Sequence, residues 1–400
     1  MEQVGEASRA LARGEALRAL ALVGRLETSI GLTLRGIAYA QIGDLVLARR
    51  SLERASALEH RPLGLARIQA ALVEIALTEG DPASAARAAR ASAETLTELG
   101  DARNAMMQRL VLARAEVLLG RLDEARRTVD EVLAAKLGPD LRAVASLARA
   151  EIAVRAVRAT AALAALTDAR RALADSSNEL LARALVALER ELAAPIARLQ
   201  RGGAVRDADL FAIESASRGD VLLVDACRRL AIAGRASIVL AKRPVMFALL
   251  FALARAWPND LGRDALAGAA FEAKKVNASH RARLRVEIGR LRKILHGVAE
   301  PVATAAGYAL RSRRDVVLLL PPTDGEDARL AILLGDGASW SAQALAEHAG
   351  VSRRTAQRVL AAMVERGAVV RTGKGRFVRY ARPGAPIASR MLLLGLVPKT

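Results

Sequence analysis

Residues 344–360 read ALAEHAGVSRRTAQRVL, and this stretch carries the clearest local signal in the chain. Apolar residues follow helical spacing on both sides of Gly350, and a glycine permits a tight turn between two helices. Ser352 stands where its hydroxyl group can cap the second of these helices. We therefore predict two short helices joined by a turn, at 342–349 and 353–366.

Two short strands are expected after the second helix, at 368–371 and 376–380. With them, residues 325–382 resemble the winged form of the bacterial helix-turn-helix, in which the second helix reads DNA. The resemblance implies that the first turns of the second helix and the connection between the strands contact DNA. The implied contact residues are Ser352, Arg353, Arg354, Thr355, Gln357, Arg358, Lys374 and Arg376. Winged helices also serve as protein-docking or dimerisation units, and this alternative stays open.

A second arginine-rich stretch lies at 284–295, where the sequence reads LRVEIGRLRKIL, and GYAL follows at 307–310. Its leucine and isoleucine residues recur at helical spacing and predict one buried face. We expect a helix from His280 to Leu295, with Ser279 as its N-cap. The arginines then fall on the other faces of this helix.

Shorter elements are predicted before that long helix. They are strands at 221–225, 229–233 and 237–240, a helix at 244–256 and a short helix at 264–268. With LLVD at 222–225 and LGRDAL at 261–266, the pattern resembles the winged-helix domain of the OmpR/PhoB type, also found in Streptomyces antibiotic regulatory proteins.

In the OmpR/PhoB family the long helix enters the major groove, and the hairpin after it contacts the adjoining backbone or minor groove. The contact residues implied here are Lys274, Lys275, Arg281, Arg283, Arg285, Arg290 and Arg292. Arginine is suited to this role because it binds phosphates and guanine edges. Ala282 departs from the family, whose members often carry an arginine there, and this weakens the implied base contacts. The alternative is that these arginines form only a solvated helix face.

Small residues recur at fixed offsets in the first half of the chain. From Leu34 onward they are Gly36, Tyr39, Gly43, Ala48, Leu52 and Ala55, followed by Pro62. These offsets resemble the tetratricopeptide repeat, a helix–turn–helix unit of about 34 residues. The pattern recurs around Gly80 and Gly120 and more weakly at Gly14, where glycine is expected in the turns. Residues 141–199 are expected to continue as alanine-rich helices, with Arg201-Gly202-Gly203 as the hinge that ends the array.

The net charge of +19 is unevenly distributed along the chain. Residues 1–204 carry 29 lysines and arginines against 25 acidic residues, whereas residues 218–316 carry 19 against 8. A basic excess confined to one region is typical of a surface that binds a polyanion. The charge therefore favours double-stranded DNA as a partner of the C-terminal half.

Other classes of protein are disfavoured by what the sequence contains. Cys227 is the only cysteine, the four histidines are scattered, and no nucleotide-binding or catalytic motif stands out. We expect no catalytic residues, no metal and no cofactor. The start of the chain does not resemble a signal peptide, and its apolar runs fall short of the roughly 18 residues of a membrane span. We expect a cytoplasmic protein that does not enter a membrane.

We therefore predict a mainly α protein, with a tetratricopeptide-like helical array followed by two winged-helix domains with small β-sheets. The expected segments are an array at 1–204, winged helices at 205–320 and 321–382, and a tail at 383–400. The leading hypothesis is a sequence-specific DNA-binding transcription regulator whose array binds a protein or peptide partner or senses a signal. The competing hypothesis is a scaffold or transcription cofactor whose winged helices bind protein. The sequence leaves the oligomeric state open.

Overall fold

The computed structural model describes residues 2–174, 178–271, 273, 275–321, 326–335, 340–372 and 378–381. Contacts divide the chain into two compact units. The first consists of the residues up to Leu192, with Trp340 and a hairpin near the C-terminus. The second consists of Ala193–Gly335 and Ser341–Gly367. The long array of helices and the larger sheets therefore belong to different units.

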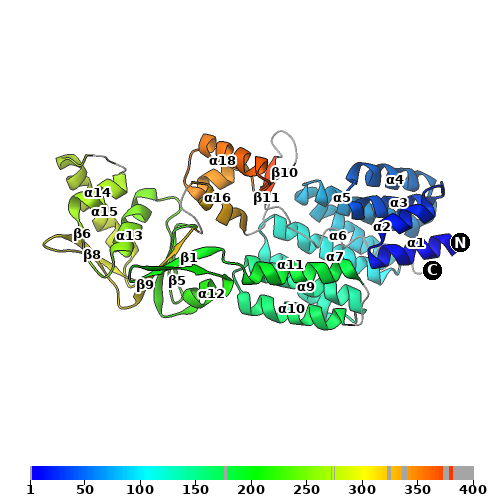
Figure 1. Ribbon diagram of the computed structural model, residues 1–400, viewed down its shortest axis with the longest axis horizontal. Coiled ribbons are helices and arrows are strands. Elements are labelled where there is room, and N and C mark those ends of the chain that lie inside the picture. The colour runs from blue at the N-terminus through cyan, green and yellow to red at the C-terminus, as the bar shows by residue number, and fades with distance from the viewer. Residues whose placement is uncertain are drawn as a thin grey trace. The chain divides into compact units, whose positions relative to one another are not determined.

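The first unit is an array of helices, and from α1 to α10 the helices adjacent in sequence pack side by side (Figure 1). They are α1 Glu2–Arg13, α2 Ala16–Val23, α3 Ser29–Ile42, α4 Leu45–Leu58, α5 Pro62–Thr78, α6 Pro82–Glu98, α7 Ala102–Leu118, α8 Leu122–Ala134, α9 Pro139–Arg155, α10 Ala159–Leu173 and α11 Glu179–Ala193. Most of the core side chains between them are alanine and leucine. Small side chains let neighbouring helices approach closely, so one such pair buries little alone and the pairs stack.

Glycine followed by aspartate separates consecutive helices at several turns. Gly43 ends α3 with a φ of +93°, a left-handed conformation that costs glycine little. The carboxylate of Asp44 then accepts a hydrogen bond from the backbone N–H of Leu47 at 3.0 Å and caps α4. The same pair recurs at 80–81 and 100–101. The predicted turn glycines are confirmed at Gly14, Gly43, Gly80 and Gly120, all with positive φ.

The absence of a side chain at Gly36 explains why α3 and α4 pack so closely. A Cβ atom built there would lie 2.7 Å from Cγ of Leu52 and 3.1 Å from the carbonyl oxygen of Ala48, both on α4. The three residues have the spacing noted in the sequence. The small-residue pattern therefore marks the line along which these two helices touch.

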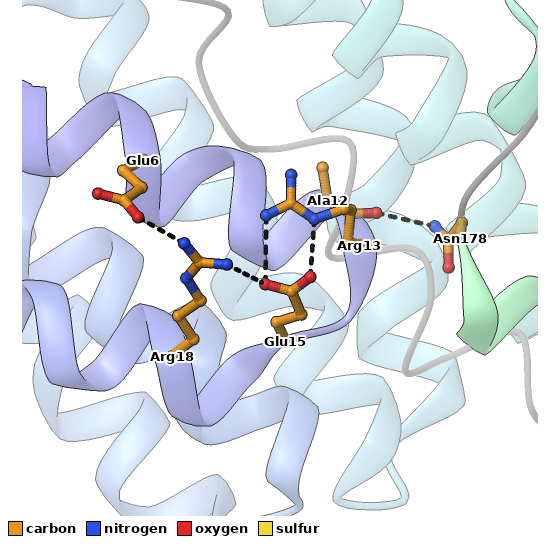
Figure 2. A network of polar contacts seen from close by, with 6 residues as sticks. All are labelled: Glu6, Ala12, Arg13, Glu15, Arg18 and Asn178. Carbon is orange, nitrogen blue, oxygen red and sulfur yellow. Dashed lines mark hydrogen bonds and ion pairs between the residues drawn. The ribbon is translucent and has the colours of Figure 1, made fainter.

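Helix α11 returns to the start of the array. The side-chain amide of Asn178, which precedes α11, donates to the carbonyl oxygen of Ala12 at 3.1 Å (Figure 2). Leu180 packs against the turn at Gly14, where a Cβ atom would come within 2.7 Å of its Cγ. Figure 2 also shows Arg13 bonded to Glu15 beside this contact. The last helix of the unit is thereby fastened to the turn between the first two.

A six-stranded sheet forms the centre of the second unit, with strand order β2-β1-β9-β3-β4-β5. Its strands are β1 Ala197–Arg201, β2 Ala204–Ala208, β3 Val221–Asp225, β4 Leu230–Ala233, β5 Ala236–Val239 and β9 Asp315–Leu320. Strands β3 and β9 are parallel, and the other neighbours are antiparallel. The predicted strands at 221–225, 229–233 and 237–240 correspond to β3, β4 and β5, with small shifts at the ends. The pairing of β9 with β3 was not predicted.

The expected hinge at 201–203 is instead the turn of a hairpin, so that prediction is corrected. Arg201 pairs with Ala204 across the turn, and Gly202 and Gly203 have φ values of +56° and +88°. Two left-handed glycines make the tight turn that a two-residue hairpin needs. Strand β1 also pairs with β9, so the hairpin belongs to the sheet of the second unit. The division between the units falls at 192/193 rather than at 204/205.

Helices cover this sheet and lead to a smaller one. They are α12 Leu210–Arg218, α13 Pro244–Ala256, α14 Arg263–Phe271 and α15 Ala278–Ile294, and the three-stranded sheet has the order β6-β8-β7, with β6 Leu261–Gly262, β7 Glu300–Ala303 and β8 Gly307–Arg311. Leu284, Ile288 and Leu291 of α15 are buried in one apolar cluster with Leu249 and Leu253 of α13. The buried stripe predicted for the long helix is therefore confirmed.

Three further helices belong to the second unit: α16 Glu326–Gly335, α17 Ala342–Ala349 and α18 Arg353–Glu365. The first unit includes the antiparallel hairpin β10 Val370–Thr372 and β11 Arg379–Ala381, in which Tyr380 forms a β-bridge with Trp340. The predicted fold class is confirmed, since a mainly α chain opens with a helical array and continues with small sheets. Among the described residues, no helix has the length and apolar character needed to cross a bilayer.

Candidate nucleic-acid interface

Helices α17 and α18 meet at a tight turn centred on Gly350. Its φ of +65° places it in the left-handed region, which a glycine adopts at little cost. Ser341 caps α17 through the backbone N–H of Ala344, and Ser352 caps α18 through that of Thr355 at 3.0 Å. The local order helix, glycine turn, capped helix is therefore the one that the sequence predicts.

The first two turns of α18 present a row of exposed polar side chains. Arg353, Arg354 and Gln357 are exposed and form no hydrogen bond or ion pair with the described part of the chain. Arg358 is also exposed, but it is engaged in a contact of its own. On the opposite side, Ala356, Val359, Leu360 and Met363 are buried. Packing of one face thus turns the other, with its two free guanidinium groups and one free amide, outward.

The remaining predicted residues of this region have different surroundings. The hydroxyl groups of Ser352 and Thr355 lie 2.9 Å apart and are occupied in the helix cap. Lys374 and Arg376, expected between the two strands, lie outside the described residues. Of the contact residues predicted in this region, the exposed ones without a partner among the described residues therefore lie at the start of α18.

Helix α15 begins two residues earlier than expected. Asn277 rather than Ser279 is its N-cap, because the Asn277 side chain accepts from the backbone N–H of His280 at 3.0 Å. The His280 ring completes a reciprocal capping box by accepting from the backbone N–H of Asn277 at 3.3 Å. Ser279 was a plausible cap by residue type, but it lies inside the first turn.

Most of the predicted arginines on α15 bind groups of the protein itself. The guanidinium of Arg281 makes two hydrogen bonds, of 2.7 and 2.6 Å, to the carboxylate of Asp264 on α14. These bonds lower the pKa of Asp264 and raise that of Arg281. Arg290 forms a 3.0 Å ion pair with Glu287, one turn back along the helix. Both arginines remain partly exposed, but part of their charge is compensated locally.

Arg292 and Arg283 are also held by neighbours. Arg292 donates to the carbonyl oxygen of Pro301 at 2.8 and 3.2 Å and lies 3.5 Å from Glu300. The Arg283 guanidinium carbon lies 4.6 Å from the centre of the Phe271 ring, which is the geometry of a cation–π contact. These groups are therefore positioned by contacts within the second unit, whereas the family resemblance implies DNA contacts for them.

Arg285 and Lys275 are exposed, and neither forms a hydrogen bond, ion pair or ring contact with the described residues. Lys274 lies outside the described residues. Near Arg285, the outward face of α15 carries the exposed Ala282 and Val286. The exposed fraction of Val286 is 55%. This face has fewer free charges than the arginine count of the helix suggests.

A concave basic surface near the C-terminal end of α15 was missed from the sequence. Its cavity of about 1230 Å³ is lined in part by His296, Arg292, Arg311, Arg313 and Arg314. Arg314 is paired with Asp220 at 2.6 Å, whereas Arg311 and Arg313 are exposed and have no partner among the described residues. The signal was the run RSRR at 311–314, directly after the GYAL motif at 307–310.

In the first unit, charged side chains largely satisfy one another. Buried Arg114 and Arg155 both bond to Glu151, with an Arg155–Glu151 distance of 2.7 Å. Burial lowers the pKa of Arg114, and the two guanidinium groups lower that of Glu151 against its own burial. The array therefore uses much of its charge internally, and the free positive charge of α18 contrasts with it.

No protein-family model matches the chain, and neither a curated protein nor a solved structure matches it. Within the described ranges, no group of three or more histidine, cysteine, aspartate or glutamate side chains is arranged to hold a metal ion. Function is therefore inferred from the geometry and charge of the second unit.

Proposed function

We propose that this chain is a sequence-specific DNA-binding transcription regulator of a winged-helix type, with α18 as its principal reading helix. The observation that supports this most strongly is the start of α18, where Arg353, Arg354 and Gln357 are exposed and unpaired within the described residues. Arginine binds phosphates and guanine, and glutamine binds adenine through two hydrogen bonds. This side-chain set suits a DNA groove better than an apolar protein surface.

The winged-helix segment predicted at 205–320 would add electrostatic affinity for DNA. Arg285 of α15 and the exposed Arg311 and Arg313 offer phosphate contacts, and the region from 218 to 316 carries a large basic excess. Two DNA-binding segments in one chain raise each other's effective concentration on a duplex. Binding of this kind weakens steeply with salt because phosphate contacts release counterions.

The helical array would be the partner-binding or sensing part of this regulator. Its stacked helical hairpins and turn glycines support a tetratricopeptide-like assignment, in which grooves commonly bind peptides or proteins. This role rests on similarity of architecture. We also propose a cytoplasmic location, where a DNA-binding regulator of bacterial type would meet its target.

Duplex binding by the full-length chain tests the proposal directly. Fluorescence anisotropy with a mixed-sequence duplex at two salt concentrations should show binding that weakens as salt rises. The double variant Arg353→Ala/Arg354→Ala should bind roughly ten- to hundredfold more weakly, and its salt slope should fall by about two. Selection of bound genomic fragments would then show whether binding has a sequence preference.

Matched arginines in the array provide the control. Arg171 and Arg183 are exposed, and each forms only an ion pair with a neighbour one turn away, Asp168 and Glu179 respectively. The variant Arg171→Ala/Arg183→Ala removes the same charge and should bind DNA nearly as well as the wild type. Equal binding by both double variants would remove α18 from the DNA-binding surface.

A scaffold or cofactor that binds protein through α15 is a second candidate. It is favoured by the exposed Val286 and Ala282 on a helix whose arginines are mostly paired. A chain that fails to bind duplex at low salt, while Val286→Asp abolishes capture of a protein partner, would support this reading. Retained DNA binding that depends on Arg353 and Arg354 would count against it.

A further inference from the structure

The second unit contains an apolar cavity that the DNA-binding proposal does not use. It has a volume of about 460 Å³ and lies among residues of α13, α14, α15 and the loop after β3. Cavities of several hundred Å³ are typical of small-molecule sites. The cavity is lined by Ala226, Arg229, Pro244, Val245, Phe247, Ala248, Phe251, Ala252, Ala269, Ala270, Phe271 and Arg283.

Aromatic rings gather at this cavity although they are rare in the chain. Three of the five phenylalanines line it, namely Phe247, Phe251 and Phe271. Phe247 and Phe251 stack with ring centres 5.9 Å apart. Small alanine side chains make up much of the remaining lining. The walls therefore suit a flat, apolar body.

The polar groups in the lining are cationic. Arg283 lies over Phe271 and forms no ion pair with the described residues, and Arg229 contributes a second guanidinium group. One Nη2 hydrogen of Arg229 points to the carbonyl oxygen of Gly350 at the long distance of 3.5 Å. Among the described residues, none that lines the cavity is acidic. A bound anion would therefore be favoured over a cation or a neutral molecule of the same shape.

We propose that this cavity binds a small amphipathic anion, with an aromatic or branched-alkyl body among the phenylalanines and a carboxylate or similar group at Arg283. The assignment explains why Arg283 packs onto a ring at the cavity rather than extending from α15 toward a groove. It does not depend on DNA binding by α18, because the cavity residues and the reading residues are different.

A pair of fluorescent probes tests the requirement for an anion. 8-Anilino-1-naphthalenesulfonate carries one sulfonate, and N-phenyl-1-naphthylamine has the same aromatic body without it. Titration of the full-length chain should show saturable binding of the sulfonate at one site. Arg283→Gln should weaken that binding about tenfold, which corresponds to about 1.4 kcal/mol, and change binding of the neutral probe by less than about twofold.

Two further variants separate the cavity from general charge. Arg285→Gln removes a neighbouring exposed charge of α15 that does not line the cavity, and it should leave both probes unaffected. Ala252→Phe fills the cavity and should abolish binding of both probes. Thermal unfolding shows whether each variant is folded, and since a ligand of the native state raises the unfolding temperature, the sulfonate should raise it in the wild type.

The proposal fails if the sulfonate binds without saturation or lowers the unfolding temperature, because the probe then recognises partly unfolded chains. It also fails if Arg283→Gln and Arg285→Gln weaken binding equally, since binding would then follow net charge. If a folded Ala252→Phe variant binds both probes as the wild type does, the site lies elsewhere.

Discussion

Helices α15 and α18 of the second unit both carry rows of arginines, but the neighbours of those arginines differ. On α15, the Arg281 guanidinium binds Asp264 and that of Arg290 binds Glu287. On α18, Arg353 and Arg354 extend from the first turn with no partner among the described residues. The number of basic residues on a helix is therefore a poor guide to how much of its positive charge is unpaired. Acidic groups on adjacent elements decide how much of that charge is available to a ligand.

The largest expected effect compares two double variants in DNA binding. Arg353→Ala/Arg354→Ala should lose most of the affinity, whereas Arg281→Ala/Arg290→Ala should lose less than about threefold, because its arginines already have partners. Anisotropy titrations at matched salt measure both. A greater loss in the α15 variant would reverse the assignment of the reading helix.

Alanine substitutions at Gly350, in the turn before α18, and at Gly289, inside α15, should change the free energy of unfolding in opposite directions. Gly350→Ala places a side chain at a φ of +65° and against the Arg229 guanidinium, so we expect a loss of about 1–2 kcal/mol. Gly289→Ala lies in the interior of α15 with open space around its Cβ position and should gain about 0.5–1 kcal/mol. Chemical denaturation measures both changes. If Gly350→Ala does not lower the free energy of unfolding, the left-handed turn conformation at Gly350 is not required.

Removing the ion-pair partner of Arg281 should show whether α15 can contact DNA. Asp264→Asn removes the charged partner of Arg281 while keeping the size of the side chain, so the freed guanidinium should strengthen DNA binding by about two- to fivefold. The salt slope should rise by about one if Arg281 reaches a phosphate. Asp260→Asn, a nearby acidic residue bonded to Thr304, is the matched control. Unchanged affinity in Asp264→Asn would indicate that α15 stays away from the duplex.

The smallest expected effect is a dependence on pH. The pKa of Asp264 is lowered in the folded chain by Arg281, so the pair stabilises the fold above the unfolded-state pKa of about 3.9. That contribution is lost as pH falls through the lower, folded-state pKa. An NMR titration should show the Asp264 pKa rising toward about 3.9 in Arg281→Ala. An identical pKa in both proteins would contradict the pairing.

Local features were predictable to a large extent. The sequence predicts the helix at 244–256, the turn at Gly350 and the cap at Ser352, because each depends on residues within one or two turns of chain. Prediction was less successful at the hairpin β1–β2, which an alanine- and arginine-rich stretch conceals. Strand β9 was also missed, since its parallel partner β3 lies about ninety residues earlier.

The candidate site likewise combines features that local sequence predicts with features that depend on packing. The residue types at the start of α18 and their helical order follow from the sequence, whereas the exposed Arg311 and Arg313 of the RSRR run were not predicted. The pairing of Arg281 with Asp264 joins residues on different helices, and the contact of Arg283 with Phe271 depends on how those helices pack. No periodicity within α15 reveals such partners.

The order of residues indicates the approximate positions of many helices and turns, which faces are apolar, and which region of the chain is basic. These properties are local, since capping, φ preference and helical spacing act over a few residues. Packing between distant segments sets which arginines are compensated, where three phenylalanines line a cavity, and how Asn178 bonds to Ala12. Those outcomes require groups far apart in the chain to meet, and a packed core rather than any local preference brings them together.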